Sequence, residues 1–189
     1  MNVFCVGTGR CGTKTFSVAC SHLHNFTSGH ESNARRIGAD RLRYPPNHVE
    51  ADARLTWFLG GLLRCYPDAF FVWLRRDREQ VVQSYVRREI QARAHGELGI
   101  LHSFGLGLPG MVGMPVIGWG EAELVEAARA YCQTVEDTIS LAFRVIPEAQ
   151  RMHLELRTIR NDFWRFMAAI GAEGDRDRAV AEWDHKHNH

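Results

Sequence analysis

Hydrophobic residues form short apolar runs that alternate with stretches in which they recur at helical spacing. The run at 2–6 ends in glycines, and from 13 to 23 the apolar residues return at the intervals of an amphipathic helix. Residues 69–74, "AFFVWL", lack polar alternation, as expected for a strand buried on both faces of a parallel sheet. The pattern predicts further strands at 25–28 and 151–156, and helices at 51–65, 78–93, 121–143 and 161–170.

This alternation of strands and helices predicts an α/β fold, a three-layer sandwich with a mostly parallel central sheet like that of P-loop NTPases. The length of 189 residues suits one domain, so we expect a single domain over 1–189. Residues 96–120 break the pattern with eight glycines and two prolines. A connection of this length in a compact domain is typical of a substrate loop or lid.

Charge and cysteine usage narrow the function classes. The sequence has 23 Lys and Arg residues against 22 Asp and Glu residues, so it lacks the strong positive charge that would favour a nucleic-acid partner. The five cysteines are scattered and contain no C-x-x-C pair, which argues against a disulfide framework and against a zinc site. The apolar run near the start is too short for a membrane span or a secretory signal. We therefore expect a cytoplasmic protein without a membrane partner.

The stretch "GTGRCGTKT", residues 7–15, joins the first predicted strand to the first predicted helix. A Walker A loop has the pattern G-x-x-x-x-G-K-[ST], whose lysine reaches the β and γ phosphates of ATP. Here Thr13 stands in place of that lysine and Lys14 follows one residue later, a shift that turns a helical side chain by about 100°. The glycines and the helix N-terminus still favour an anion site. The alternative is a glycine-rich turn that only connects the strand to the helix.

A second cluster, "LRRDREQVVQSYVRR" at 74–88, places Arg76 just after the predicted buried strand and Ser84 eight residues later. An arginine can bind a phosphate through two parallel hydrogen bonds, and a serine hydroxyl can add another. In the alternative interpretation, Arg76 is an ordinary cation at a strand end and Ser84 an ordinary residue of a helix face.

Together the two motifs resemble those of sulfotransferases that use 3′-phosphoadenosine 5′-phosphosulfate (PAPS). In that family a loop of the type G-x-x-[RK]-[ST]-G-T holds the 5′-phosphosulfate, and R-[DN]-P with a serine eight residues after the arginine holds the 3′-phosphate. The segment "MHLELRTIRNDFWRFMAAIG" at 152–171 resembles the C-terminal strand, loop and helix of many bacterial members. The resemblance implies that the nucleotide is bound by Gly9, Arg10, Cys11, Gly12, Thr13, Lys14, Thr15, Arg76 and Ser84.

The chain also departs from the family pattern. Cys11 stands where serine is usual, and Arg78 replaces the proline of R-D-P. A G-x-x-G-x-x-K loop, which binds adenosine in cytosolic members, is not evident.

The resemblance implies transfer of a sulfuryl group from PAPS to a hydroxyl or amine of a small molecule or glycan, with 3′-phosphoadenosine 5′-phosphate (PAP) as product. By analogy with phosphoryl transfer, the reaction needs charge stabilisation and removal of a proton, and it needs no metal. Arg10 and Lys14 are the expected charge stabilisers.

For the base, the segment "SGHES" at 28–32 offers Glu31 first and His30 second, with His48 and Glu50 behind them. Glu31 resembles the acid of a "GHPxE" region in some bacterial members. The alternative is that Glu31 is a solvated loop acid or pairs with Arg35 or Arg36.

Two rival functions remain at this point. A P-loop kinase of a small metabolite would need magnesium and ATP, and Asp77 is the acid nearest to the end of the predicted buried strand. A non-catalytic nucleotide-binding module would keep the anion sites without turnover.

The histidines of the tail "DHKHNH" at 184–189 suggest either a metal site or, as we expect, a flexible polar terminus. A homo-oligomer is left open.

Overall fold

The computed structural model describes residues 1–97, 119–185 and 187, which divide into two compact units. The first unit comprises residues 1–76 and 138–189, and the second comprises residues 77–137. The expectation of a single domain over 1–189 stays a prediction. Most of the predicted substrate loop at 96–120 lies outside the described residues.

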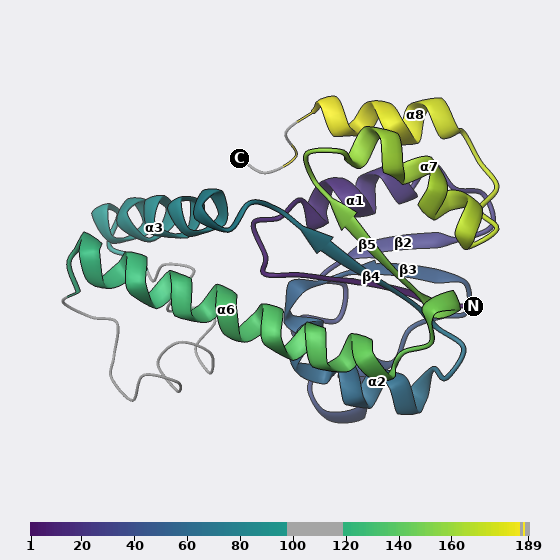
Figure 1. The fold of residues 1–189 in the computed structure, drawn as a ribbon, viewed down its shortest axis with the longest axis horizontal. Coiled ribbons are helices and arrows are strands. Elements are labelled where there is room, and N and C mark those ends of the chain that lie inside the picture. The colour runs from purple at the N-terminus through teal and green to yellow at the C-terminus, as the bar shows by residue number, and fades with distance from the viewer. Residues whose placement is uncertain (98–118, 186, 188–189) are drawn as a thin grey trace. The chain divides into compact units, whose positions relative to one another are not determined.

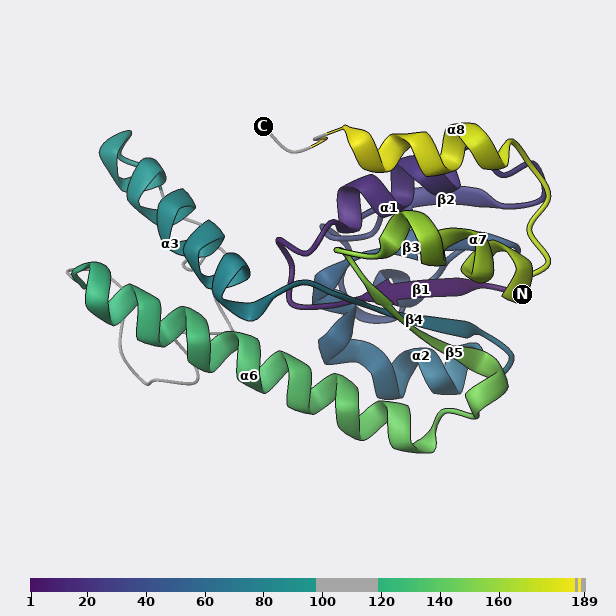
Figure 2. The same cartoon turned by 45° about the horizontal axis from the view of Figure 1, so that its top comes forward.

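The first unit is built on a five-stranded sheet in which every pairing is parallel. The spatial order is β2-β3-β1-β4-β5, so β1 lies at the centre, between β3 and β4 (Figures 1 and 2). Val3 of β1 pairs with Val49 on one side and with Phe70 on the other. The strands are β1 (Val3–Val6), β2 (Thr27–His30), β3 (His48–Ala51), β4 (Phe70–Arg75) and β5 (Arg151–Glu155).

This strand order places the loop after β1 at a topological switch point. The chain leaves β1 toward β2 on one side and later crosses from β3 to β4 on the other side of β1. Open parallel sheets bind ligands at such a crevice, beyond the carboxyl ends of the strands. The fold therefore puts residues 7–15 where a ligand is expected.

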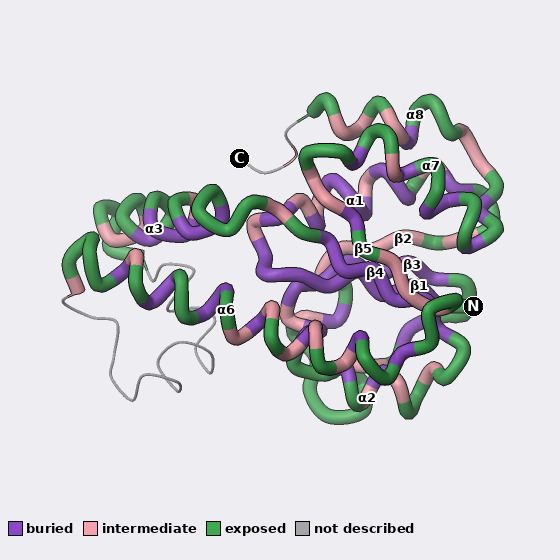
Figure 3. Tube along the Cα trace, viewed as in Figure 1, coloured by how far each residue is buried: buried purple, intermediate pink, exposed green. Residues whose placement is uncertain are grey.

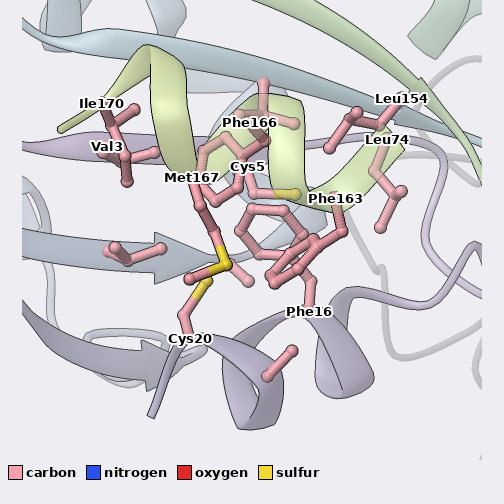
Figure 4. Close-up of a cluster of buried hydrophobic side chains, with 14 of the residues drawn as sticks. Val3, Cys5, Phe16, Cys20, Leu74, Leu154, Phe163, Phe166, Met167 and Ile170 are labelled. Atoms are coloured by element: carbon pink, nitrogen blue, oxygen red, sulfur yellow. The ribbon is translucent and has the colours of Figure 1, made fainter. Parts of the chain in front are cut away.

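Helices cover both faces of the sheet, which makes three layers within the first unit (Figure 1). Alternate residues of β1 point to opposite faces. Val3 and Cys5 belong to a buried cluster with Phe16 and Phe163 (Figure 4), whereas the Phe4 ring packs at 5.5 Å from that of Tyr44. The helices of this unit are α1 (Thr13–Cys20), α2 (Leu59–Cys65), α7 (Ile159–Ala169) and α8 (Arg176–Ala181), with 3₁₀ helices η1 (Gly38–Leu42), η2 (Ala53–Phe58), η3 (Glu148–Gln150) and η4 (Glu182–Asp184).

The second unit consists of α3 (Arg78–Ala94) and the part of α6 (Glu121–Val145) up to residue 137. Its two helices pack through apolar side chains, with the rings of Tyr85 and Tyr131 in edge contact at 5.6 Å. Figure 3 shows that the buried positions of these helices recur at intervals along each of them. Arg78, at the start of α3, forms an ion pair with Glu136.

The predicted α/β class, with its parallel sheet and flanking helices, is confirmed. The strand predicted at 25–28 lies two residues later, at Thr27–His30. Strand β3 was not predicted, because two of its four residues, His48 and Glu50, are polar yet buried against each other. The helix predicted from residue 51 is instead η2 followed by α2, and α8 was not predicted.

Candidate functional site

The loop from Gly7 to Gly12 turns sharply at the end of β1. Gly9, Arg10 and Gly12 have φ angles of 74°, 54° and 103°, in the left-handed region that favours glycine. A Cβ atom on Gly7 would lie 2.5 Å from the carbonyl oxygen of Leu74, so only glycine allows the loop to pass this close to β4. A sharp turn can direct successive backbone N–H groups into one concavity, which suits an anion.

Helix α1 begins at the end of this loop and presents its N-terminus to the same place. Its N-cap, Gly12, provides no side-chain hydrogen bond, and the first turn contains no acidic residue. Backbone N–H groups at such an end attract anions, and the helix dipole adds to this effect. The first turn also carries Lys14, which is half-buried, between the buried Thr13 and Thr15. Cys11 is fully buried, and burial raises the pKa of its thiol to about 11, so it stays neutral.

Arg76 follows β4 and faces the loop. Its Nη1 donates a hydrogen bond to the carbonyl oxygen of Arg10 at 3.1 Å. The two half-buried arginines thus belong to the same edge of the sheet, as the strand order requires. Asp77, the acid of the kinase alternative, caps α3 by accepting a hydrogen bond from the backbone N–H of Gln80 at 3.0 Å. Ser84 is a half-buried residue of α3 in the second unit, and its phosphate-binding role stays a prediction.

His30, the last residue of β2, lies beside the start of α1. Its Nε2 is 3.2 Å from the hydroxyl oxygen of Thr13. Burial lowers the pKa of His30 below its ordinary value, and Lys14 lowers it further, while Glu31 acts in the opposite direction. The structure therefore brings His30, Thr13 and Lys14 together, and it favours a neutral imidazole at pH 7.

Glu31 is held in a different way. Its φ of 55° turns the chain sharply after β2, and its carboxylate forms an ion pair with Arg54. The sequence alternatives for its partner were Arg35 and Arg36, so the partner is a residue that sequence reasoning missed. Asp52 accepts a hydrogen bond from the backbone N–H of Arg54 at 2.8 Å. This contact is the signature of a 3₁₀ or α-helix N-cap, and the sequence "DAR" at 52–54 could have indicated it.

Buried charged residues lie at β3. Glu50 and Asp52 are 0% exposed, and each has a buried partner: His48 for Glu50 at 3.0 Å and Arg41 for Asp52 at 2.5 Å. His48 and Glu50, the last two base candidates from the sequence, thus bind each other. Asp52 follows the last residue of β3, and its two carboxylate oxygens are engaged by Arg41 and Arg54. In the part of the chain that the structure describes, no group of three or more His, Cys, Asp or Glu residues could hold a metal ion.

The C-terminal segment packs near the loop without forming a metal site in the described residues. The carboxylate of Glu182 contacts Nε2 of His22 at 2.8 Å and Nε2 of His187 at 2.9 Å. Trp183 packs on the ring of Phe16, and a Cβ atom on Gly12 would lie 3.5 Å from the indole. Trp183, just before the tail at 184–189, thus packs on α1, and the flexibility expected of the tail stays a prediction.

Comparison with solved structures finds the same fold in a sulfotransferase domain from the curacin biosynthetic pathway. The TM-score is 0.66 with 9% sequence identity, and the alignment covers 93% of this chain and 75% of that one. No protein-family model matches the sequence. A search of curated proteins also finds no match. The chain thus has a sulfotransferase-like fold. None of the helices in the described residues is long and apolar enough to cross a membrane.

Proposed function

We propose that this protein is a sulfotransferase that moves a sulfuryl group from PAPS to a hydroxyl or amine of a small molecule or glycan and releases PAP. The observation that carries the proposal is the hydrogen bond from Arg76 to the carbonyl oxygen of Arg10. It joins the arginine at the end of β4 to the anion-binding loop after β1, so that one edge of the sheet offers donors for two separate anionic groups. The sulfotransferase-like fold is a second support.

The chemistry of the donor set fits a bisphosphorylated nucleotide. The loop contributes backbone N–H groups at a helix end that no side chain caps, and Arg10, Lys14 and Arg76 add positive charge. The backbone of Gly9, Cys11 and Gly12 and the hydroxyls of Thr13 and Thr15 complete the proposed contacts to the sulfate end. Backbone N–H groups arranged in a concavity, together with cationic side chains, can bind an anion directly.

Arg10 and Lys14 are proposed to stabilise the charge that develops on the leaving nucleotide. We assign proton removal from the acceptor to His30, because its imidazole lies beside Thr13 and its lowered pKa keeps it able to accept a proton at pH 7. Glu31, the first choice from the sequence, is engaged by Arg54. The pair His30→Gln and Glu31→Gln separates the two assignments. The first variant is expected to lose most of the transfer rate, and the second to keep more of it. The reverse order would assign the base to Glu31.

A comparison of nucleotides tests the proposal. The melting temperature of the protein is measured with PAP, with ATP and magnesium, and with adenosine 5′-phosphosulfate. A ligand that binds only the folded state stabilises it by mass action, so PAP is expected to raise the melting temperature most. Preference for ATP with magnesium would instead support a kinase. PAP binding without transfer to any acceptor in a broad screen would support a nucleotide-binding module. No response to any of the three contradicts all of these functions.

A further inference from the structure

Strand β3 and the residue that follows it carry two carboxylates, Glu50 and Asp52, whose residues are 0% exposed. Carboxylates are seldom buried unless ion pairs and hydrogen bonds replace the water that they lose. They also add little to stability on average, because desolvation offsets the attraction. Both carboxylates are connected to the turn at 30–32, which follows β2. Glu50 binds the backbone of Ser32, and Asp52 binds Arg54, which pairs with Glu31.

Glu50 holds the backbone of this turn. One oxygen of its carboxylate accepts a hydrogen bond from the N–H of Ser32 at 2.9 Å, and the other contacts Nε2 of His48 at 3.0 Å. Nδ1 of His48 in turn lies 2.8 Å from the hydroxyl oxygen of Thr27 on β2. A Cβ atom on Gly29 would be 3.0 Å from the Glu50 carboxylate, so glycine at this position lets the carboxylate approach β2 closely. Burial raises the pKa of Glu50, but the hydrogen bonds from His48 and Ser32 outweigh it and leave the pKa below its ordinary value.

Arg54 binds the side chain of Glu31 in this turn. Its guanidinium pairs with the carboxylate of Glu31, and its backbone and Nε are bound by the buried Asp52. The side chains of Glu31 and Arg54 are 39% and 35% exposed, whereas that of Asp52 is 0% exposed. The partly exposed ion pair of Glu31 and Arg54 is thus connected to the buried carboxylate of Asp52. Glu31 has a φ of 55°, which a residue with a side chain adopts only when its surroundings impose it.

We infer that Glu50 and Arg54 are positioning residues of this site: together they hold the turn so that the imidazole of His30 stays beside Thr13. The inference rests on the proposed function, in which His30 accepts the proton of the acceptor. Glu50 acts through the N–H of Ser32 and Arg54 through the carboxylate of Glu31. A displacement of a reacting group by about 1 Å can cost roughly 10²-fold in rate, so loss of either contact is expected to slow transfer without weakening the binding of PAP.

Two pairs of variants test this role. Glu50→Ala removes both acceptors, whereas Glu50→Gln can still accept from Ser32 and can donate its amide to His48 if the imidazole proton moves to Nδ1. Arg54→Met removes the ion pair with Glu31, whereas Arg54→Lys retains the charge. Glu148→Ala is the control, because the Glu148 side chain is 93% exposed and contacts Arg151 only at 3.7 Å. Arg54→Met keeps the test valid if Glu50→Ala does not fold, because the Arg54 side chain is 35% exposed whereas Glu50 is fully buried.

Three measurements are made on each folded variant: the dissociation constant of PAP, kcat for sulfuryl transfer to a phenolic acceptor or to water, and hydrogen exchange of the amides at 30–32. Glu50→Ala and Arg54→Met are expected to lower kcat about 10- to 100-fold with PAP affinity within about 3-fold. Exchange at 30–32 should accelerate in both, while the amides at 7–12 keep their protection. Glu50→Gln, Arg54→Lys and the control should resemble the wild type.

Unchanged exchange at 30–32 in Glu50→Ala and Arg54→Met overturns the inference, and so does an equal loss of kcat in the conservative variants. A parallel loss of PAP affinity would also overturn it, because the two residues would then support the nucleotide loop rather than the turn. If the wild-type protein does not bind PAP, the proposed function fails, and the exchange result alone decides whether the turn is held as described.

Discussion

Arg76→Ala gives the sharpest test of the nucleotide site, because the chain offers a matched control one residue away. Arg75 carries the same charge at the same strand end, but it pairs with Glu155 at 3.3 Å and lies over the Trp73 ring. Arg76 instead donates to the carbonyl oxygen of Arg10 in the loop. Arg75→Ala and Arg76→Ala therefore remove equal charge, and only the second removes a group that faces the loop.

The magnitude follows from the kind of contact that is lost. A hydrogen bond between charged partners contributes about 1.5–3 kcal/mol, so Arg76→Ala is expected to weaken PAP binding roughly 10- to 150-fold. Arg75→Ala removes a positive charge that is farther from the loop and is screened by salt. It should therefore weaken PAP binding less than about 3-fold. Both variants should unfold at similar temperatures without ligand, since the interactions that each arginine loses are partly exposed to solvent.

Thermal shift converts this difference into a measurement. At a PAP concentration of 100 times the wild-type dissociation constant, the ligand stabilises the folded state by about 2.7 kcal/mol. For a chain of this size that corresponds to a rise of roughly 5–11 °C in melting temperature. A 100-fold weaker site would leave only about 0.4 kcal/mol, or roughly 1 °C. The reasoning is refuted if Arg76→Ala retains the full shift, or if Arg75→Ala loses as much as Arg76→Ala.

Three further predictions follow from the described residues. Gly12→Ala should lower the free energy of unfolding by about 1–3 kcal/mol in a denaturant titration, because the φ of Gly12 is 103°; no change would mean that the loop relaxes freely. Burial lowers the pKa of His30 and His153 below 6.5, so the folded state binds fewer protons than the unfolded chain. Stability should therefore fall as the pH drops from about 7 through that range, and His30→Gln with His153→Gln should flatten the dependence. Cys65 is the exposed thiol among the five cysteines, so a thiol reagent should label one site quickly and Cys11 only after unfolding; two fast sites would contradict the burial of the others.

Residues near one another in the chain made much of the fold predictable. The apolar run of β4 and the glycine loop between β1 and α1 are local patterns, and each has the predicted structure. The helical spacing of α3 and α6 also leads to helices with nearly the predicted bounds. In these segments the side chains that decide the structure lie within one or two turns of each other, so periodicity is enough.

Strand β3 shows where such reasoning fails. A segment that contains His48, Glu50 and Asp52 is expected to be exposed, since charged side chains are rarely buried without a partner. A single sequence does not reveal that a carboxylate has such a buried partner. The partner of Asp52 is Arg41, eleven residues earlier, and the N–H bound by Glu50 belongs to Ser32, eighteen residues earlier. The same limit hid the contact between Arg54 and Glu31.

The sequence by itself determined the α/β class and led to the predictions that residues 7–15 bind an anion and that Arg76 binds the same ligand, because each depends on a local pattern. Only the tertiary structure decided that Arg76 faces Arg10, that His30 lies beside Thr13 and that Glu31 is bound by Arg54. Such contacts arise when a parallel sheet brings the ends of separate strands to one edge, and the strand order that does so is set by packing over the whole unit.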